Sequence, residues 1–223
     1  MATATLHLPG EETVRRSALI LGAPGSGKTR LAGTWPHPLF VDLENGAASA
    51  TSGGATRIVV ATEKSTLTTV RNIIDRVKKG AFSKGLTTFE YDSKMLKIGT
   101  VVIDPLDVVQ QACKQFDVLK GSRSKMEWDD WDTILNLMLP LILDLNSLPV
   151  HTVVISHVKR KEGKKTKRGD NLPGFMEAAM QGSLRSQLPG WFDVVLHILV
   201  NDEGERGVLI SPRTHQGYRI LAK

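Results

Sequence analysis

The chain has 223 residues, 41% hydrophobic and 23% charged, a composition that excludes a disordered or fibrous protein. Its single cysteine, Cys113, excludes an internal disulfide framework and fits a reducing compartment. Lys and Arg number 29 against 23 Asp and Glu, a net charge of +6. No stretch is typical of a signal peptide or of a membrane span. We therefore expect one cytoplasmic domain over residues 1–223, with 1–15 as a flexible or edge segment.

Short apolar runs alternate with amphipathic stretches, the pattern of an α/β protein with a mainly parallel sheet. We expect strands over 17–21, 39–43, 57–61, 100–103 and 152–156, and helices over 27–34, 65–79, 106–119, about 129–148 and 175–188. Pro140 predicts a bend in the fourth of these helices. Two last strands, 194–200 and 207–211, flank a polar turn and predict an antiparallel hairpin at a sheet edge.

The most specific motif is Gly22-Ala23-Pro24-Gly25-Ser26-Gly27-Lys28-Thr29, a full match to the phosphate-binding P-loop. Polyphosphate needs closely spaced backbone N–H donors, and the glycines let the backbone approach it while the next helix directs its positive end at the phosphates. We expect Lys28 to contact the β- and γ-phosphates and Thr29 to ligate Mg²⁺. The alternative is a glycine-rich turn that matches the pattern by chance. The position of the motif, after an apolar strand and before a helix, argues against that alternative. The motif therefore predicts a nucleotide site.

Two carboxylates at strand ends could complete that site. An apolar strand ends on Asp104, the Walker B arrangement, which would place a carboxylate beside the metal ion. The alternative is an acidic turn residue before Pro105. Glu44 follows the strand over 39–43, the first strand after the P-loop helix. It could orient and deprotonate water for attack on the γ-phosphate, with Asp42 as the second candidate. The alternative for Glu44 is an acid that favours a helix N-terminus.

The strand over 152–156 ends at Ser156 and His157, a polar pair that could sense the γ-phosphate or could simply be solvated. A basic tract follows, with seven basic residues and one acid, so this tract alone accounts for the net charge of +6. We expect a mobile loop that binds a phosphate backbone with salt-dependent affinity, the alternative being a solvated charged loop. The basic residues of the tract are Lys159, Arg160, Lys161, Lys164, Lys165, Lys167 and Arg168.

Aromatic residues are missing from the basic tract, so any stacking on bases must come from elsewhere. Trp128 and Trp131 follow a second, smaller basic stretch over 120–125, and we expect them to be packing residues. Arg213 follows the last hairpin and could reach the γ-phosphate of a neighbouring subunit as an arginine finger. Arg219 and Lys223 are rival candidates for that role, and a plain surface role is the alternative for all three.

The order of these elements resembles the RecA-like P-loop ATPase core, and more narrowly the phage-encoded nucleotide-binding proteins of the single-strand annealing recombinase type. The segments that carry the resemblance are 22–29, 40–46, 101–104, 126–131, 153–157 with the basic tract, 180–182, and the hairpin ending near Arg213. The resemblance implies binding of ATP and Mg²⁺, hydrolysis of ATP, and binding of single-stranded DNA in phage recombination or strand annealing. A single-strand DNA-binding protein and further copies of the chain are the partners it implies.

Three other functions fit the same residues. The first is an annealing or DNA-binding module whose nucleotide site is regulatory and hydrolyses slowly. The second is a P-loop kinase with the basic tract as its lid, although such lids use spaced arginines and this tract is mostly lysine. The third is a switch ATPase that does not act on DNA.

Overall fold

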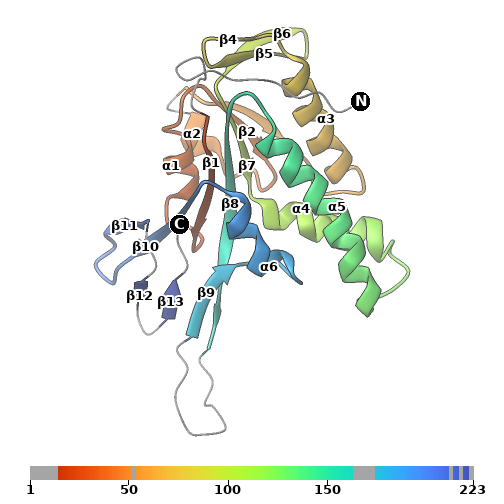
Figure 1. The fold of residues 1–223 in the computed structure, drawn as a ribbon, viewed down its shortest axis with the longest axis vertical. Coiled ribbons are helices and arrows are strands. Elements are labelled where there is room, and N and C mark those ends of the chain that lie inside the picture. The colour runs from red at the N-terminus through yellow and green to blue at the C-terminus, as the bar shows by residue number, and fades with distance from the viewer. Residues whose placement is uncertain (1–14, 52–53, 163–173, 211–212, 216–217, 221–223) are drawn as a thin grey trace, which may run out of the picture.

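The computed structural model describes residues 15–51, 54–162, 174–210, 213–215 and 218–220. Its centre is a mainly parallel sheet whose main path has the strand order β11-β10-β1-β8-β7-β2-β3 (Figure 1). These strands are β1 (Ser17–Gly22), β2 (Pro38–Asp42), β3 (Thr56–Val59), β7 (Thr100–Asp104), β8 (His151–Lys161), β10 (Val194–Val200) and β11 (Arg206–Leu209). Only β11 runs antiparallel to its neighbour on this path, so the expected edge hairpin is confirmed.

Helices cover both faces of the sheet (Figure 1). On one face lie α1 (Lys28–Ala32) and α2 (Ala48–Thr51), and on the other lie α3 (Thr66–Lys79), α4 (Leu106–Ala112) and α5 (Trp128–Asn146). After α4 the chain continues as a π-helical turn over Cys113–Val118, within the expected helix 106–119. α5 begins at a capping box made by Glu127 and Asp130 and runs through Pro140. No described helix is long and apolar enough to cross a membrane.

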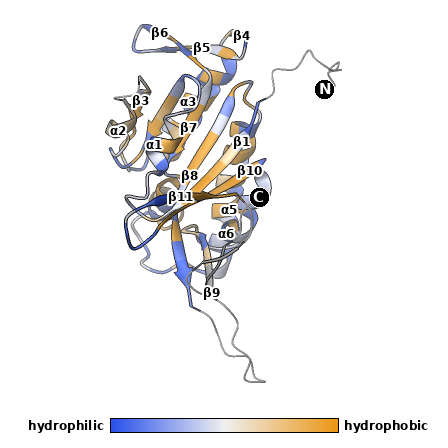
Figure 2. Cartoon of the chain, turned by 90° about the vertical axis from the view of Figure 1, so that its left-hand side faces the viewer, coloured by the Kyte–Doolittle hydropathy of each residue, from blue (hydrophilic) through white to orange (hydrophobic). Residues whose placement is uncertain are grey.

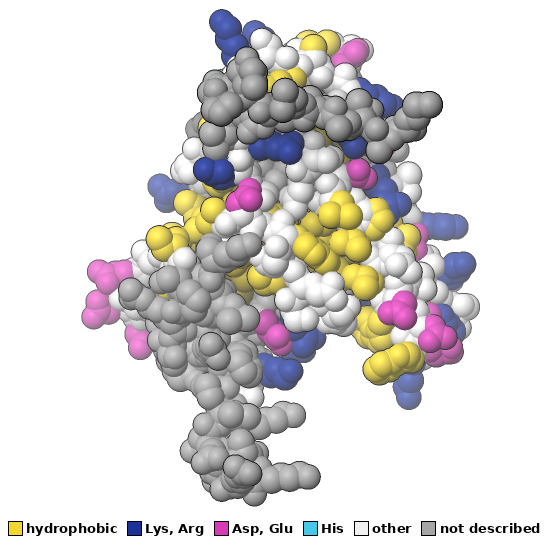
Figure 3. Space-filling view, in the orientation of Figure 1, with side chains coloured by type: hydrophobic (Ala, Val, Ile, Leu, Met, Phe, Trp, Pro, Cys, Tyr) yellow, Lys and Arg dark blue, Asp and Glu magenta, His cyan; other side chains and the backbone are white. Residues whose placement is uncertain are grey.

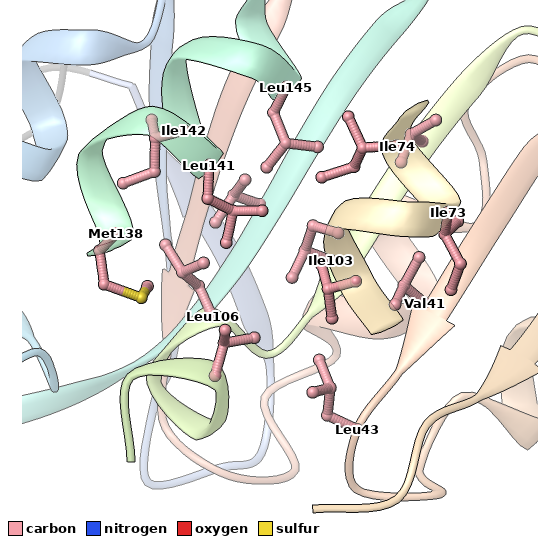
Figure 4. Packing of buried hydrophobic residues seen from close by; sticks show 14 of the residues in the cluster. Val41, Leu43, Ile73, Ile74, Ile103, Leu106, Met138, Leu141, Ile142 and Leu145 are labelled. Carbon is pink, nitrogen blue, oxygen red and sulfur yellow. The ribbon is translucent and has the colours of Figure 1, made fainter. Parts of the chain in front are cut away.

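Two apolar cores, one on each face, hold the layers together. Successive strand residues alternate between them: Leu19 and Leu21 of β1 join the larger core under α3–α5, and Ile20 joins the smaller core under α1 and α2. Figure 2 shows the central strands as hydrophobic along most of their length. In Figure 4, side chains of α3 and α5 meet those of β2 and β7 in the larger core. Because these strands are buried on both faces, each is a continuous apolar run in the sequence.

β8 is longer than expected and forms a ribbon beyond the main sheet. Its last residues pair antiparallel with β9 (Gly174–Ala178), which pairs with β13 (Tyr218–Ile220), and β13 pairs with β12 (Arg213–His215). The helix expected over 175–188 is therefore wrong in its first half. Met176 and Ala178 are buried while Glu177 between them is partly exposed, the alternation of a strand. The helical part is confined to α6 (Leu184–Gln187), followed by a 3-10 turn over Leu188–Trp191.

A small antiparallel sheet was not expected from the sequence. It consists of β4 (Phe82–Ser83), β5 (Leu86–Tyr91) and β6 (Lys94–Ile98) and lies next to α3 (Figure 1). A two-residue turn joins β5 to β6, and its residues Asp92 and Ser93 have φ values of 48° and 62°. This is the left-handed geometry that hairpin turns require, here adopted without a glycine.

Candidate nucleotide site and its surroundings

The P-loop residues 22–29 join β1 to α1, as the sequence predicts. Gly25 and Gly27 have φ values of 74° and 101°, which favour glycine. A Cβ on Gly22 would stand 2.5 Å from Ser26 Oγ, so the loop also needs its first glycine for space. Lys28 is buried, and its Nζ donates to the carbonyl oxygens of Gly22 at 3.0 Å and Ala23 at 2.9 Å. Burial lowers the pKa of Lys28, although nearby carboxylates oppose this shift.

Thr29 and Asp104 lie together, as expected of two groups near one metal ion. Thr29 Oγ1 donates a hydrogen bond of 2.7 Å to Asp104 Oδ2 at the end of β7. Burial raises the pKa of Asp104 to about 6, and the hydrogen bond from Thr29 opposes that rise. A hydroxyl and a carboxylate are oxygen ligands that suit Mg²⁺, which takes the rest of its coordination from phosphates and water. Among the described residues no group of three or more His, Cys, Asp or Glu could hold a metal ion. The Thr29 hydroxyl and the Asp104 carboxylate, which lie within hydrogen-bond distance, fit Mg²⁺ bound together with a nucleotide.

Asp42 and Glu44 have different surroundings. Asp42 is 1% exposed, and its carboxylate accepts hydrogen bonds from the backbone N–H groups of Glu44, Gly46 and Ala47. It also pairs with Arg57 at 3.4 Å. These contacts occupy Asp42 in shaping the turn after β2. Glu44 is exposed and lines the same cavity as the P-loop, where its carboxylate could reach a water molecule.

His157 lies beside the P-loop and is held by a residue that the sequence did not single out. In the sheet register His157 is level with Gly22. Asp107, in the first turn of α4, accepts hydrogen bonds from the backbone N of His157 and from its Nδ1, both at 3.0 Å. The bond to Asp107 raises the pKa of His157, against burial, which lowers it. Burial raises the pKa of Asp107, but the hydrogen bonds from His157 outweigh burial and hold it below its ordinary value.

The other nitrogen of the His157 ring, Nε2, lies 3.9 Å from Oε2 of Glu44. Ser156, the other half of the expected sensor pair, is fully buried in β8 and donates from Oγ to the carbonyl oxygen of His157 at 3.1 Å. His157 lines the nucleotide cavity, whereas Ser156 is not among the lining residues. The cavity has a volume of about 650 Å³.

The basic tract begins as a strand rather than as a loop. Lys159, Arg160 and Lys161 are exposed residues of β8, paired with β9, so the expectation of a mobile loop is wrong for them. Figure 2 shows that this end of β8 is hydrophilic. The remaining basic residues lie outside the described residues; they are Lys164, Lys165, Lys167 and Arg168.

A second cavity, of about 720 Å³, adjoins the start of the basic tract. Its lining includes Trp128, Trp131, Lys159 and Arg185. Trp128 is 87% exposed, so it is not the packing residue that the sequence suggested. Trp131 is partly buried against the larger core, as expected. Figure 3 shows acidic and basic side chains next to an exposed hydrophobic patch at the lower end of α5.

Two arginines of the C-terminal strands are candidates for contact with a nucleotide, Arg213 and Arg206. Arg213 begins β12, but its side chain lies outside the described residues. Arg206 begins β11 and lines the nucleotide cavity. Sequence reasoning missed Arg206, because its approach to the P-loop depends on how the edge hairpin folds back along β10.

Comparisons with known proteins bear on the family and the fold of the chain. A family model described as an AAA domain matches residues 15–218. Comparison with curated protein sequences gives no significant match. A prototypical ATPase from the type III secretion system of pathogenic bacteria has 13% identity and a TM-score of 0.50, over 84% of this chain and 51% of that one. The chain thus spans about half the length of that ATPase.

A KaiC-like protein from the hyperthermophilic archaeon Pyrococcus horikoshii OT3 has 16% identity and a TM-score of 0.46, over 88% of this chain and 78% of that one. At such low identities, structural likeness bears on the fold alone. The sheet, with its P-loop after β1 and helices on both faces, has the RecA-like P-loop architecture.

Proposed function

We propose that this chain, which belongs to the family described as an AAA domain, hydrolyses ATP and couples ATP binding and hydrolysis to the binding of single-stranded DNA. The role proposed is recombination or strand annealing of the phage-encoded type that its motifs resemble. A single-strand DNA-binding protein and further copies of the chain are its proposed partners. The observation that carries the proposal is β8: one continuous strand holds His157 beside the P-loop and Lys159, Arg160 and Lys161 on the ribbon.

The nucleotide chemistry is assigned to residues around the P-loop. Backbone N–H groups of the loop and Lys28 bind the polyphosphate. Thr29 and Asp104 would hold Mg²⁺, which neutralises charge on the phosphates when bound. Glu44 orients water for in-line attack and accepts its proton, because it is the exposed carboxylate of this cavity that is not occupied in shaping a turn.

The coupling is assigned to the pair formed by Asp107 and His157. His157 is fixed on one side by Asp107 and approaches Glu44 on the other. A change at the γ-phosphate that shifts Glu44 would therefore act on a residue of β8. Because β8 is hydrogen-bonded to β9 just beyond this point, a displacement of His157 would reach the basic ribbon.

The DNA surface is assigned to the ribbon and the second cavity. Lys159 belongs to both, since it is exposed on β8 and lines the cavity next to Trp128. Exposed aromatic rings provide stacking platforms for bases, and lysines contact the phosphates between them. Acids lie near Trp128, but Arg123 pairs with two of them, Glu127 at 2.9 Å and Asp130 at 2.8 Å. In the sequence the basic tract continues with Lys164, Lys165, Lys167 and Arg168, which add further positive charge.

ATP turnover with and without oligo-dT, over a series of salt concentrations, tests the proposal. We expect DNA to stimulate turnover and DNA binding to weaken steeply as salt rises. The double variant Lys159→Ala/Lys161→Ala should bind DNA more weakly and bind ATP unchanged. Its matched control removes two lysines from the small sheet, Lys94→Ala/Lys97→Ala, and should leave both unchanged.

Trp128 supplies an independent readout. Oligo-dT is expected to quench the intrinsic fluorescence of the wild-type protein, and Trp128→Ala should remove most of that quenching. If DNA neither stimulates turnover nor binds, the DNA part of the proposal is wrong and a switch ATPase that does not act on DNA is favoured. If DNA binds equally well to the Lys159→Ala/Lys161→Ala variant, the ribbon is not the contact surface.

A further inference from the structure

Arg206 stands at the edge of the sheet where nucleotides bind. It is opposite Val200 in the antiparallel pair of β10 and β11, two residues beyond Ile198. Ile198 is level with Gly22, where β1 ends and the P-loop begins. Arg206 is therefore positioned above the carboxyl ends of the parallel strands, the edge at which open α/β sheets bind their ligands.

The side chain of Arg206 lies against the P-loop itself. Its Cδ and Nε atoms are 3.5 and 3.6 Å from the position that a Cβ on Gly27 would take. Gly27 has a φ of 101°, a conformation that favours glycine. Because glycine has no Cβ, the arginine side chain can lie against this side of the loop. Among the described residues, the guanidinium of Arg206 makes no hydrogen bond and no ion pair. It is thus an exposed, permanently charged group placed within reach of a bound nucleotide.

The charged groups that line the cavity indicate what Arg206 could bind. The carboxylates of Asp42, Glu44 and Asp104 line the cavity together with the cations of Lys28, Arg30 and Arg206. The Lys28 ammonium is held by two carbonyl oxygens, and burial lowers its pKa. A bound polyphosphate would add several negative charges beside these carboxylates. A guanidinium suits that charge because it can donate two parallel hydrogen bonds to phosphate oxygens.

We propose that Arg206 binds the polyphosphate of the nucleotide held by the P-loop of its own chain. The edge hairpin β10–β11 then acts as a wall of the nucleotide site, and Arg206 supplies in cis a phosphate contact. This differs from the role expected for Arg213, which would reach the site of a neighbouring subunit. The inference depends on nucleotide binding and is independent of any role in DNA binding.

Calorimetric titration of the full chain with Mg²⁺ and either ADP or inorganic tripolyphosphate tests the contact. Arg206→Ala is expected to lower the affinity for both by about ten- to a hundredfold, the effect of losing a charged hydrogen bond. Arg206→Lys should fall between Arg206→Ala and the wild type. Lys97→Ala, which removes one exposed cation from β6, should leave both affinities unchanged. Arg206→Gln repeats the test with a side chain of similar length, should the alanine variant fold poorly.

Tripolyphosphate is the deciding ligand, because it has no base or sugar. If Arg206→Ala binds tripolyphosphate as tightly as the wild type, the proposal is overturned, and a loss confined to ADP would place Arg206 on the base or ribose. Mixing tests the cis arrangement. ATP turnover should not recover when Arg206→Ala chains are mixed with Lys28→Ala chains, and recovery would show that the arginine acts across a subunit interface.

Discussion

Replacing Asp107 with asparagine is expected to lower the pKa of His157 and to destabilise the protein in slightly acidic solution. In the native chain the Asp107 carboxylate accepts two hydrogen bonds from His157, one from the backbone and one from the ring, both 3.0 Å long. Only 22% of the His157 side chain and 15% of the Asp107 side chain are exposed, so solvent screens this pair weakly. A hydrogen bond to a charged group contributes about 1.5–3 kcal/mol to the free energy of unfolding.

The pH dependence follows from the directions of the two pKa shifts. The pKa of His157 is raised in the folded state, so its contribution is complete below its ordinary value of 6.5 and is lost as pH rises through the folded value. The pKa of Asp107 is lowered in the folded state, so its contribution is present above its ordinary value of 3.8 and is lost only as pH falls through the folded value. We therefore expect a loss of about 1.5–3 kcal/mol near pH ~5.5 and a clearly smaller loss near pH ~8.5.

Urea unfolding at both pH values measures the loss, and a double-mutant cycle with His157→Gln isolates the pair from other titrating groups. NMR titration of the His157 ring gives its pKa directly in the native chain and in Asp107→Asn. A coupling free energy that is equal at both pH values, or a His157 pKa that does not fall in the variant, would refute the reasoning.

Three further variants test other parts of the structure. Glu44→Gln should retain ATP binding while its turnover falls at least about a hundredfold, and strand annealing that survives this loss would favour a regulatory nucleotide site. Gly22→Ala should weaken ATP binding and destabilise the fold by about 1–3 kcal/mol, because the added Cβ would stand 2.5 Å from the Oγ of Ser26. The control Gly190→Ala adds a Cβ with no atom within 4 Å. It should change neither ATP affinity measured by calorimetry nor the melting temperature. Leu141→Ala, at a fully buried position, should lower the free energy of urea unfolding by about 2–5 kcal/mol, and Leu143→Ala, at a position that is 53% exposed, should change it little.

The sequence predicted what depends on local pattern. The P-loop, the buried strands and the amphipathic helix over 65–79 are each specified by contiguous residues, and the structure places them as expected. Asp104 could be paired with Thr29 in advance, because parallel strands bring their carboxyl ends to one edge of the sheet.

What the sequence could not supply depends on contacts between distant segments. Asp107 is 50 residues from His157 in the chain, and no local pattern links the two. The segment after 174 has helical spacing, but pairing with the extended end of β8 makes it a strand. Arg206 meets the P-loop only because the edge hairpin folds back beside β10. In the segment after 174 tertiary pairing overrides local propensity, and in the other two cases it brings together residues that are far apart in the chain.

The affinity for fluorescent oligo-dT, measured by anisotropy with a non-hydrolysable ATP analogue and Mg²⁺ and again without nucleotide, tests the coupling between the P-loop and the basic ribbon most directly. The account predicts that the analogue changes DNA affinity by about five- to a hundredfold, and that DNA changes the affinity for the analogue by the same factor. In Asp107→Asn, which removes the carboxylate charge that holds His157, both factors should move toward one. Equal DNA affinity with and without the analogue in the wild-type protein would contradict the account.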